Sequence, residues 1–251
     1  MRQKRGVRGR IKRVLRPIFQ PLLDEIYRFA HPARTGSIKG VTLLLRHPEI
    51  SARMFKLLIK GRYEMAEQTL LSRWLNAEDR VLECGSAIGF LALYSIKVVG
   101  IKEYALVEPN PRLREVLEEN FSLNGSDLDR TPFIEAAVTA TDGAVEFSLH
   151  RNFFASSTRA FKNATKKMQV KALSLPSISA SLPFVPNTLI MDIEGGEVDL
   201  PPEHFLTFDK ILLETHEAVS GPKDTDRFLT SLITSFVIRD RIGAIIYLER
   251  R

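Results

Sequence analysis

The chain has a single cysteine and no apolar run long enough to span a bilayer. One cysteine excludes an internal disulfide, so the composition is compatible with a reducing compartment. Because neither a long apolar run nor a signal-like core follows the basic N-terminus, we expect no membrane-spanning helix and no secretory signal. A length of 251 residues with 44% hydrophobic side chains predicts one sizeable domain with an N-terminal segment, in a cytoplasmic protein.

Acidic residues are absent from residues 1–16, which we interpret as a basic arm. Its eight basic side chains are Arg2, Lys4, Arg5, Arg8, Arg10, Lys12, Arg13 and Arg16. The chain has 36 basic and 30 acidic residues, so without these eight the remainder has 28 basic residues and is close to neutral. Such an arm can contact nucleic acid or an anionic membrane surface, or it can be a solvated tail.

Apolar residues at helical spacing continue from the arm, between Val14 and Leu23. We expect this helix to pack on the domain, with peripheral membrane contact through residues 1–23 as the alternative. Residues 17–78 as a whole predict a helical extension broken by proline and glycine, and residues 63–75 are its last helix.

Strand-like and helix-like segments alternate over residues 79–251, which we interpret as the main domain. The predicted strands are Arg80–Cys84, Tyr104–Glu108, Thr131–Thr139, Val145–Leu149, Met168–Leu173, Thr188–Asp192, Lys210–Glu214, Phe236–Arg239 and Ala244–Leu248. The predicted helices are Phe90–Val99, Pro111–Phe121 and Asp224–Ser235. Asp142-Gly143 predicts a hairpin turn at the sheet edge, and residues 150–167 predict a mobile loop over a site. The pattern predicts an α/β fold with a doubly wound, mainly parallel, Rossmann-like sheet and an antiparallel edge.

A glycine-containing turn follows the first strand, with the pattern Glu83-x-Gly85-x-x-x-Gly89. Two of the three glycines of the dinucleotide pattern G-x-G-x-x-G are missing, since Ala87 and Phe90 occupy their positions. That pattern lets the backbone approach a pyrophosphate, beside which Glu83 would place a negative charge. A cofactor with a sulfonium, an ammonium and a carboxylate but no phosphate fits better. We therefore predict S-adenosylmethionine.

Acidic residues at the ends of the first two strands have distinct predicted roles toward this cofactor. Glu83 would attract its cationic end, and the amides after Gly89 would receive its carboxylate. Glu108, at the end of the second strand, would accept both ribose hydroxyls, although it would serve NAD equally well. The alternative is that Gly85 and Gly89 form only a tight strand-to-helix turn, with Cys84 as a small buried residue.

Further polar residues follow the strands Thr188–Asp192 and Lys210–Glu214. In a doubly wound sheet the ligand lies beyond the carboxyl ends of the strands, so we expect Asp192, Glu214 and His216 to converge on the acceptor. His216 would be the general base for a hydroxyl, or Asp192 and Glu214 would hold a divalent cation that acidifies the hydroxyl. Two structural alternatives stay open. Carboxylates after Asp192 can cap the next helix, and His216 can be a hydrogen-bonded structural residue.

Over residues 61–248 the chain resembles the FkbM family of S-adenosylmethionine-dependent methyltransferases. The matching residues are Tyr63-Glu64, Glu83-x-Gly85-x-x-x-Gly89, Val107-Glu108-Pro109-Asn110-Pro111, Asn120-x-x-x-Asn124, Ala137-Val138, Asp142-Gly143, Asp192-Ile193-Glu194-Gly195-x-Glu197 and Glu214-x-His216. The resemblance implies a class I methyltransferase fold with a seven-stranded sheet, and O-methylation of a hydroxyl on a sugar, glycan or natural product. The cofactor residues are then expected to be Glu83, Gly85, Ser86, Gly89, Glu108, Asn110 and, near the adenine, Ala137.

Two other functions are compatible with the sequence. The basic arm suggests a nucleic-acid methyltransferase, but the chain has no Asn/Asp-Pro-Pro-Tyr motif after the strand Thr188–Asp192 and no Pro-Cys nucleophile, so nucleic acid is the less supported partner. A methyltransferase-like binding module without catalysis is the third hypothesis. We expect acceptor specificity to lie in residues 1–60 and in the loop 150–167.

Overall fold

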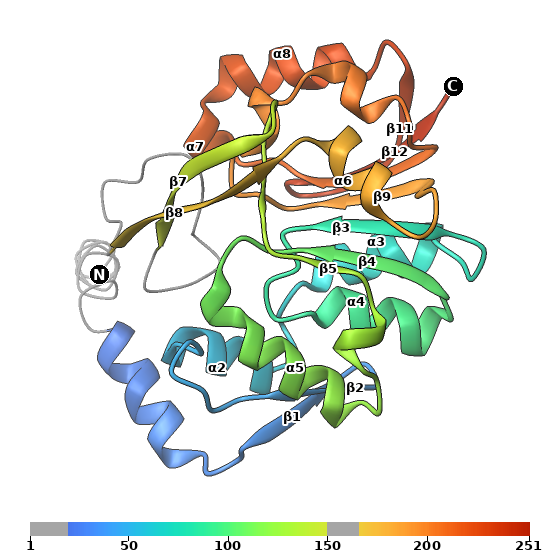
Figure 1. Cartoon of the computed structure of the whole chain (residues 1–251). Helices are drawn as coiled ribbons and strands as arrows, with labels where there is room; N and C mark the ends of the chain where they lie inside the picture. Colours follow the sequence, from blue (N-terminus) through green and yellow to red (C-terminus); the bar gives the residue numbers. More distant parts are fainter. Residues whose placement is uncertain (1–19, 150–165) are drawn as a thin grey trace, which may run out of the picture.

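Seven strands form the central sheet in the computed structural model, which describes residues 20–149 and 166–251. Their order is β11-β12-β10-β9-β3-β4-β5. Their bounds are β3 (Arg80–Cys84), β4 (Glu103–Val107), β5 (Phe133–Ile134), β9 (Thr188–Met191), β10 (Lys210–Glu214), β11 (Phe236–Ile242) and β12 (Ile245–Arg250). Neighbours from β10 to β5 are parallel, whereas β12 is antiparallel to β10 and β11. The predicted α/β class, with a doubly wound, mainly parallel, Rossmann-like sheet, is confirmed (Figure 1).

Helices cover both faces of this sheet (Figure 1). The α-helices are α2 (Ala52–Ile59), α3 (Met65–Trp74), α4 (Phe90–Tyr94), α5 (Arg114–Leu123), α6 (Leu175–Ser181), α7 (Glu217–Ser220) and α8 (Pro222–Leu232). A π-helical turn, Ser95–Val99, continues α4, and short 3-10 helices lie at Pro111–Leu113, Leu128–Arg130, Gly196–Asp199 and Pro202–Phe205.

The central strands are apolar on both faces because each face belongs to a separate core. Val81 of β3 packs in the core that contains α2, α3, α4 and α5. Leu82 and Cys84 of the same strand pack in the core that contains α6 and α8. Cys84 is fully buried, as expected for a small core residue.

Residues 35–44 correct the prediction of an all-helical extension. They form an antiparallel hairpin of β1 (Thr35–Ile38) and β2 (Val41–Leu44). Lys39 and Gly40 both have positive φ, which is typical of a tight two-residue hairpin turn. The Leu44 amide donates to Asn120 of α5 and the Thr42 amide donates to Asn124, the residue directly after α5, so partners distant in sequence hold the hairpin.

The extension shares a core with the main domain. Leu43 of β2 and Phe55 of α2 are fully buried in the same cluster as Val81. A domain boundary at residue 79 stays a prediction, and buried residues of β2, α2 and α3 share one core with the sheet.

The predicted hairpin at Asp142-Gly143 is wrong. A separate sheet has the order β6-β8-β7, so β8 (Lys166–Leu173) lies between β6 (Ala137–Val138) and β7 (Gly143–Leu149). The predicted strand 131–139 is divided between β5 of the central sheet and β6 of this one. The cause lies in Asp142, whose carboxylate accepts hydrogen bonds from the Ser174 amide (2.8 Å) and the Ser177 hydroxyl (2.6 Å) and so holds the turn at the start of α6.

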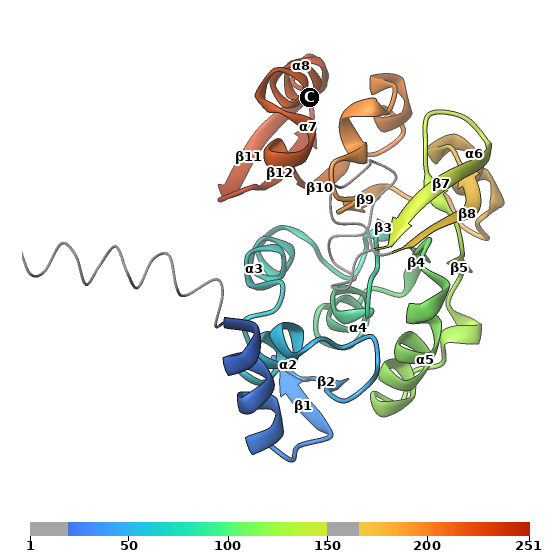
Figure 2. The same cartoon turned by 90° about the vertical axis from the view of Figure 1, so that its left-hand side faces the viewer.

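An N-terminal helix at residues 20–30 lies beside α2 at the edge of the molecule (Figure 2). Leu22 and Leu23 are 59% and 52% exposed, so the expectation that this helix buries its apolar residues is wrong for them. Within the described ranges, no helix has the length and hydropathy needed to cross a bilayer. The basic arm, residues 1–16, and positions 150–165 of the predicted loop lie outside the described residues.

Candidate functional site

A cavity of about 330 Å³ lies at the carboxyl ends of β3, β4, β9 and β10. Strand order reverses there, because β4 lies on one side of β3 and β9 on the other. Ligands of doubly wound sheets bind at this switch point. Met54 and Leu57 of α2 form part of the wall, and Phe147 of β7 contributes another part.

Gly85 allows β3 and β9 to approach each other at the switch point. Its φ is +91°, and a Cβ atom there would lie 1.8 Å from the carbonyl oxygen of Asp192. The Asp192 amide donates to the Cys84 carbonyl (2.9 Å), which fixes the same approach. Gly89 begins α4 with a φ of +77°, and its Cβ would lie 2.8 Å from Leu117. Backbone conformation and close packing therefore explain why both positions are glycine. Of the two, only Gly85 lines the cavity.

Glu108 lies in the cavity wall, as predicted for a ribose ligand. Its carboxylate accepts hydrogen bonds from the amides of Ala87 (2.9 Å) and Asn110 (2.8 Å). Burial raises the pKa of Glu108 to about 7, although the two backbone hydrogen bonds oppose the shift. A carboxylate has about four lone-pair sites, so Glu108 can accept further hydroxyl donors.

The remaining predicted cofactor residues fall into two groups. Ala137 lines the cavity together with Ala136 and Val138, which form an apolar wall. Asn110 and Ser86 are buried outside the lining. The Asn110 side chain accepts from the Arg112 amide (3.2 Å), whereas Ser86 Oγ has no hydrogen-bond partner among the described residues.

Glu83 is not part of the lining of this cavity, but it lines a smaller pocket that shares Glu64, Glu67 and Asp192 with it. Its side chain is 2% exposed and accepts a hydrogen bond from the Tyr104 hydroxyl (2.9 Å). Burial raises the pKa of Glu83 to about 8. Any attraction of Glu83 for a cationic ligand would act from this smaller pocket.

Two acids that the sequence analysis left without a role do line the cavity. Glu64 and Glu67, at the start of α3, contribute carboxyls to it. Burial is the main cause that raises the pKa of both groups. The sequence signal that could have identified Glu64 is Tyr63-Glu64, one of the motifs that match the FkbM family, to which no function was assigned.

Backbone strain is concentrated at this cavity. Four non-glycine residues of the described chain have positive φ, and three of them, Glu64 (47°), Ala87 (47°) and Glu194 (54°), line the cavity. Such conformations are held by the surrounding structure and cluster at ligand sites. The fourth, Lys39, is in the β1–β2 turn.

The lining is rich in acidic side chains. Six carboxyl side chains line the cavity, namely Glu64, Glu67, Glu108, Asp192, Glu194 and Glu214. Among the described residues of the lining, Arg53 of α2 is the one basic side chain. A cationic ligand would favour ionisation of these carboxyls and be attracted by them, whereas an anionic ligand would not.

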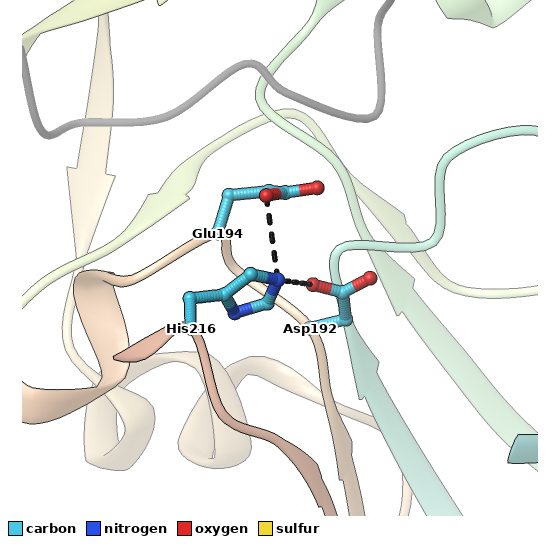
Figure 3. A group of neighbouring side chains, drawn as sticks. All are labelled: Asp192, Glu194 and His216. Carbon is cyan, nitrogen blue, oxygen red and sulfur yellow. Dashed lines mark ion pairs between the residues drawn. The ribbon is translucent and has the colours of Figure 1, made fainter. Parts of the chain in front are cut away.

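His216 lies at the centre of the acids that follow β9 and β10. Its Nε2 is 3.4 Å from Asp192 Oδ1, 3.3 Å from Glu194 Oε2 and 3.9 Å from Glu214 Oε1. Figure 3 shows Asp192 and Glu194 directed at this nitrogen. The structure thus brings Asp192, Glu214 and His216 together, as the sequence analysis expects, and their catalytic roles stay predictions.

Glu197 holds the backbone of the segments that carry Glu194 and His216. It is fully buried and accepts hydrogen bonds from the amides of Gly195 (2.9 Å) and His216 (3.1 Å). One carboxylate thus joins the segments after β9 and β10. This structural role of Glu197 is similar to the alternative in which carboxylates after Asp192 cap the next helix.

The acids hold His216 as a cation. Burial alone lowers the pKa of His216, but contact with Glu197 and the charges of Asp192 and Glu194 outweigh burial and raise it to about 10. Burial, followed by repulsion from Asp192, raises the pKa of Glu194 and Glu214 to about 8. A protonated imidazole cannot accept a proton. General-base action by His216 would therefore require a bound cation that first lowers its pKa.

The geometry also alters the predicted set of metal ligands. Ligand atoms of Asp192, Glu194 and His216 lie within 4.8 Å of one another. Glu194 thus joins Asp192 in this set, in place of the predicted Glu214. Imidazole and carboxylate are suitable ligands for several divalent metals, and cation binding here stays a prediction.

Comparisons with known proteins give fold neighbours and no close relative. No protein-family model and no curated protein matches the chain. A methyltransferase FkbM from Methylobacillus flagellatus KT is similar with 15% identity and a TM-score of 0.49, over 79% of this chain and 54% of that one. M. jannaschii TYW2 in complex with AdoMet has 13% identity and a TM-score of 0.45, over 86% of each chain. A ribosomal protein L11 methylase from Lactobacillus delbrueckii subsp. bulgaricus has 15% identity and a TM-score of 0.45, over 73% of this chain and 76% of that one.

These values carry no argument about chemistry, and the chain spans only about half of the FkbM methyltransferase. The fold is established by the sheet itself. Antiparallel β12 lies between β10 and β11 in a seven-stranded sheet, which is the class I methyltransferase arrangement that the resemblance implies.

Proposed function

We propose that this chain is an S-adenosylmethionine-dependent O-methyltransferase that acts on a hydroxyl of a sugar, glycan or natural product. The observation that carries the proposal is the acid-lined cavity at the strand switch point. It has Glu108 and the Ala136–Val138 wall on one side and the Asp192 cluster on the other.

The carboxyl and apolar side chains of the cavity suit this cofactor, which carries a positive charge and no phosphate. Glu108 would accept the ribose hydroxyls, and the apolar residues Ala136–Val138 would contact the adenine. Glu64 and Glu67 would attract the ammonium group. When bound, S-adenosylmethionine supplies an electrophilic methyl group on a sulfonium.

The residues of the chain would then orient the acceptor and remove its proton. Methyl transfer is an in-line displacement, so proximity and orientation account for most of the protein's contribution. We assign removal of the acceptor's hydroxyl proton to Asp192. This residue lies in the cavity wall, and its Oδ1 is 3.4 Å from His216 Nε2. His216 would position this carboxylate, and Glu214 lies beside the same imidazole.

Nucleic acid is disfavoured as the acceptor by the same side chains. Among the described residues, the lining has six carboxyls and one basic side chain, so it offers little attraction and, wherever a carboxyl is ionised, repulsion to a phosphodiester backbone, which is the part of a nucleic acid that provides most of its affinity. A neutral hydroxyl compound has no such penalty.

The test is transfer of an isotopically labelled methyl group from S-adenosylmethionine to a panel of hydroxyl acceptors. Asp192→Asn should lower kcat at least about 100-fold, because a positioned base contributes that much or more, while cofactor affinity stays within about twofold. Asp209→Asn, at an exposed position, is the matched control and should retain activity. Cofactor binding by the wild type without transfer to any acceptor would instead support the non-catalytic binding module.

A further inference from the structure

The N-terminal helix (residues 20–30) presents its apolar side to solvent. Leu22, Leu23, Ile26 and Phe29 are 59%, 52%, 55% and 90% exposed. Spacings of three and four residues place Leu22, Ile26 and Phe29 on one helix face, with Leu23 beside them. Large side chains gathered in this way on a surface mark an interaction site.

The polar side of this helix is the side that packs on the protein. Asp24 is 5% exposed and pairs with Lys56 of α2 (2.5 Å), and Gln20 donates to the same carboxylate (2.8 Å). The Tyr27 ring contacts Phe55 of α2 at 6.4 Å between centroids. Rotating the apolar side inward would break the partly buried Asp24–Lys56 ion pair, so these contacts fix the outward orientation.

The sequence before this helix supplies charge of one sign. Residues 1–16 contain eight Lys and Arg residues and no acid. On the helix itself the exposed acid is Glu25, and Arg28 is half-buried. An apolar helix face directly after a polybasic segment is the pair of signals that a peripheral protein uses on an anionic bilayer.

We propose that the N-terminal helix docks on an anionic lipid surface, with Leu22, Ile26 and Phe29 in the headgroup boundary and the basic arm held by the lipid charges. A nucleic acid would complement the arm but would leave the apolar face in water. A second copy of the chain could cover the apolar face, but it would bring two basic arms together. A bilayer satisfies both features.

The docked helix would place the cavity close to the membrane. Lys56 and Phe55 of α2 contact the helix, while Arg53, Met54 and Leu57 of the same α2 line the cavity. One helix therefore separates the proposed lipid contact from the proposed acceptor site. Lipid docking does not depend on the methyltransferase proposal, since it is measured without cofactor or acceptor.

The test is co-sedimentation of the full chain with vesicles of phosphatidylcholine, with and without about 30% phosphatidylglycerol. We expect binding to the anionic vesicles that weakens as salt is raised, and little binding to the neutral ones. The triple variant Leu22→Ser, Ile26→Ser, Phe29→Ser should bind at least about tenfold more weakly, because each lost apolar side chain removes buried area from the lipid contact. The matched control is Val185→Ser, Ile233→Ser, Ile238→Ser, which changes three exposed apolar residues elsewhere and should bind like the wild type.

Replacing the eight basic residues of the arm with glutamine tests the second signal and should abolish the salt dependence. Equal vesicle binding by the triple variant and its control would overturn the proposal. An absence of vesicle binding by the wild type would also overturn it. Sedimentation velocity would then test whether the helix face forms a dimer that the triple variant dissociates, and gel shifts would test whether the arm binds RNA. Melting temperatures of all variants show that each chain is folded when it is compared.

Discussion

At the scale of single residues, Gly85 is the position that most tightly limits the site. Gly85→Ala would place its Cβ against the Asp192 carbonyl and would hold an alanine at a φ of +91°. We expect a loss of at least about 3 kcal/mol of unfolding free energy from the clash and the strain together. Chemical denaturation measures this loss.

Gly125→Ala separates strain from clash. Gly125 also has positive φ (+67°), but a Cβ there meets nothing within 4 Å. Its substitution should cost only about 1 kcal/mol. Equal losses for the two variants would show that β3 and β9 do not approach each other as closely as the structure has them.

Glu83 makes the stability depend on pH. Its pKa in the folded chain, about 8, is above the ordinary 4.5, because burial disfavours the charged form. A group with a raised folded pKa contributes stability below its unfolded pKa, and that contribution is lost as pH rises through the folded pKa. Glu83→Gln keeps an oxygen that can accept from Tyr104 and removes the ionisation.

The melting temperature of Glu83→Gln should therefore rise relative to the wild type between about pH 5 and about pH 9. Glu103→Gln, at an exposed position of β4, is the control and should show no such trend. A difference between Glu83→Gln and wild type that is constant with pH would mean that Glu83 is not buried.

At the scale of elements, α5 joins the hairpin to the glycine turn. Asn120 is fully buried, accepts from the Leu44 amide (2.7 Å) and donates to the Ile88 carbonyl (2.8 Å). Asn120→Ala leaves both backbone groups without partners and should cost about 3 kcal/mol. Hydrogen exchange at the β2 amides should accelerate.

Ser122→Ala, at an exposed position of α5, should change neither stability nor exchange. If Asn120→Ala destabilises the protein but leaves β2 exchange unchanged, the hairpin is held by its apolar contacts and not by Asn120.

Runs of apolar residues in the sequence correctly predicted the central strands. The strands Arg80–Cys84 and Lys210–Glu214 have the predicted bounds, because continuous apolar runs identify strands buried on both faces. The β1–β2 hairpin was not predicted, since its amides are held by Asn120 and Asn124, some 80 residues away. The pairing of β7 with β8 was missed for the same reason, because Asp142 bonds to Ser174 and Ser177 rather than closing a hairpin.

At the scale of the whole molecule, strand order explains which site residues could be predicted. The carboxyl ends of parallel strands meet at one edge, so Glu108, Asp192 and Glu214 could be placed in one cavity from the sequence. The position of Glu83 was less predictable, because the direction of a side chain at a strand end depends on packing, here against Tyr104, and its cofactor role stays a prediction. Glu64 and Glu67 could not be found by strand logic, since they come from a helix of the extension.

The central claim is that the acid-lined cavity binds S-adenosylmethionine through Glu108, and calorimetric titration of the purified chain tests it most directly. We expect binding of S-adenosylmethionine and none of NAD, because carboxyls would face the pyrophosphate of NAD. Glu108→Gln should weaken binding about tenfold or more, which corresponds to about 1.4 kcal/mol, while Glu103→Gln should bind like the wild type. An absence of binding, equal binding of NAD, or unchanged affinity in folded Glu108→Gln would contradict the account.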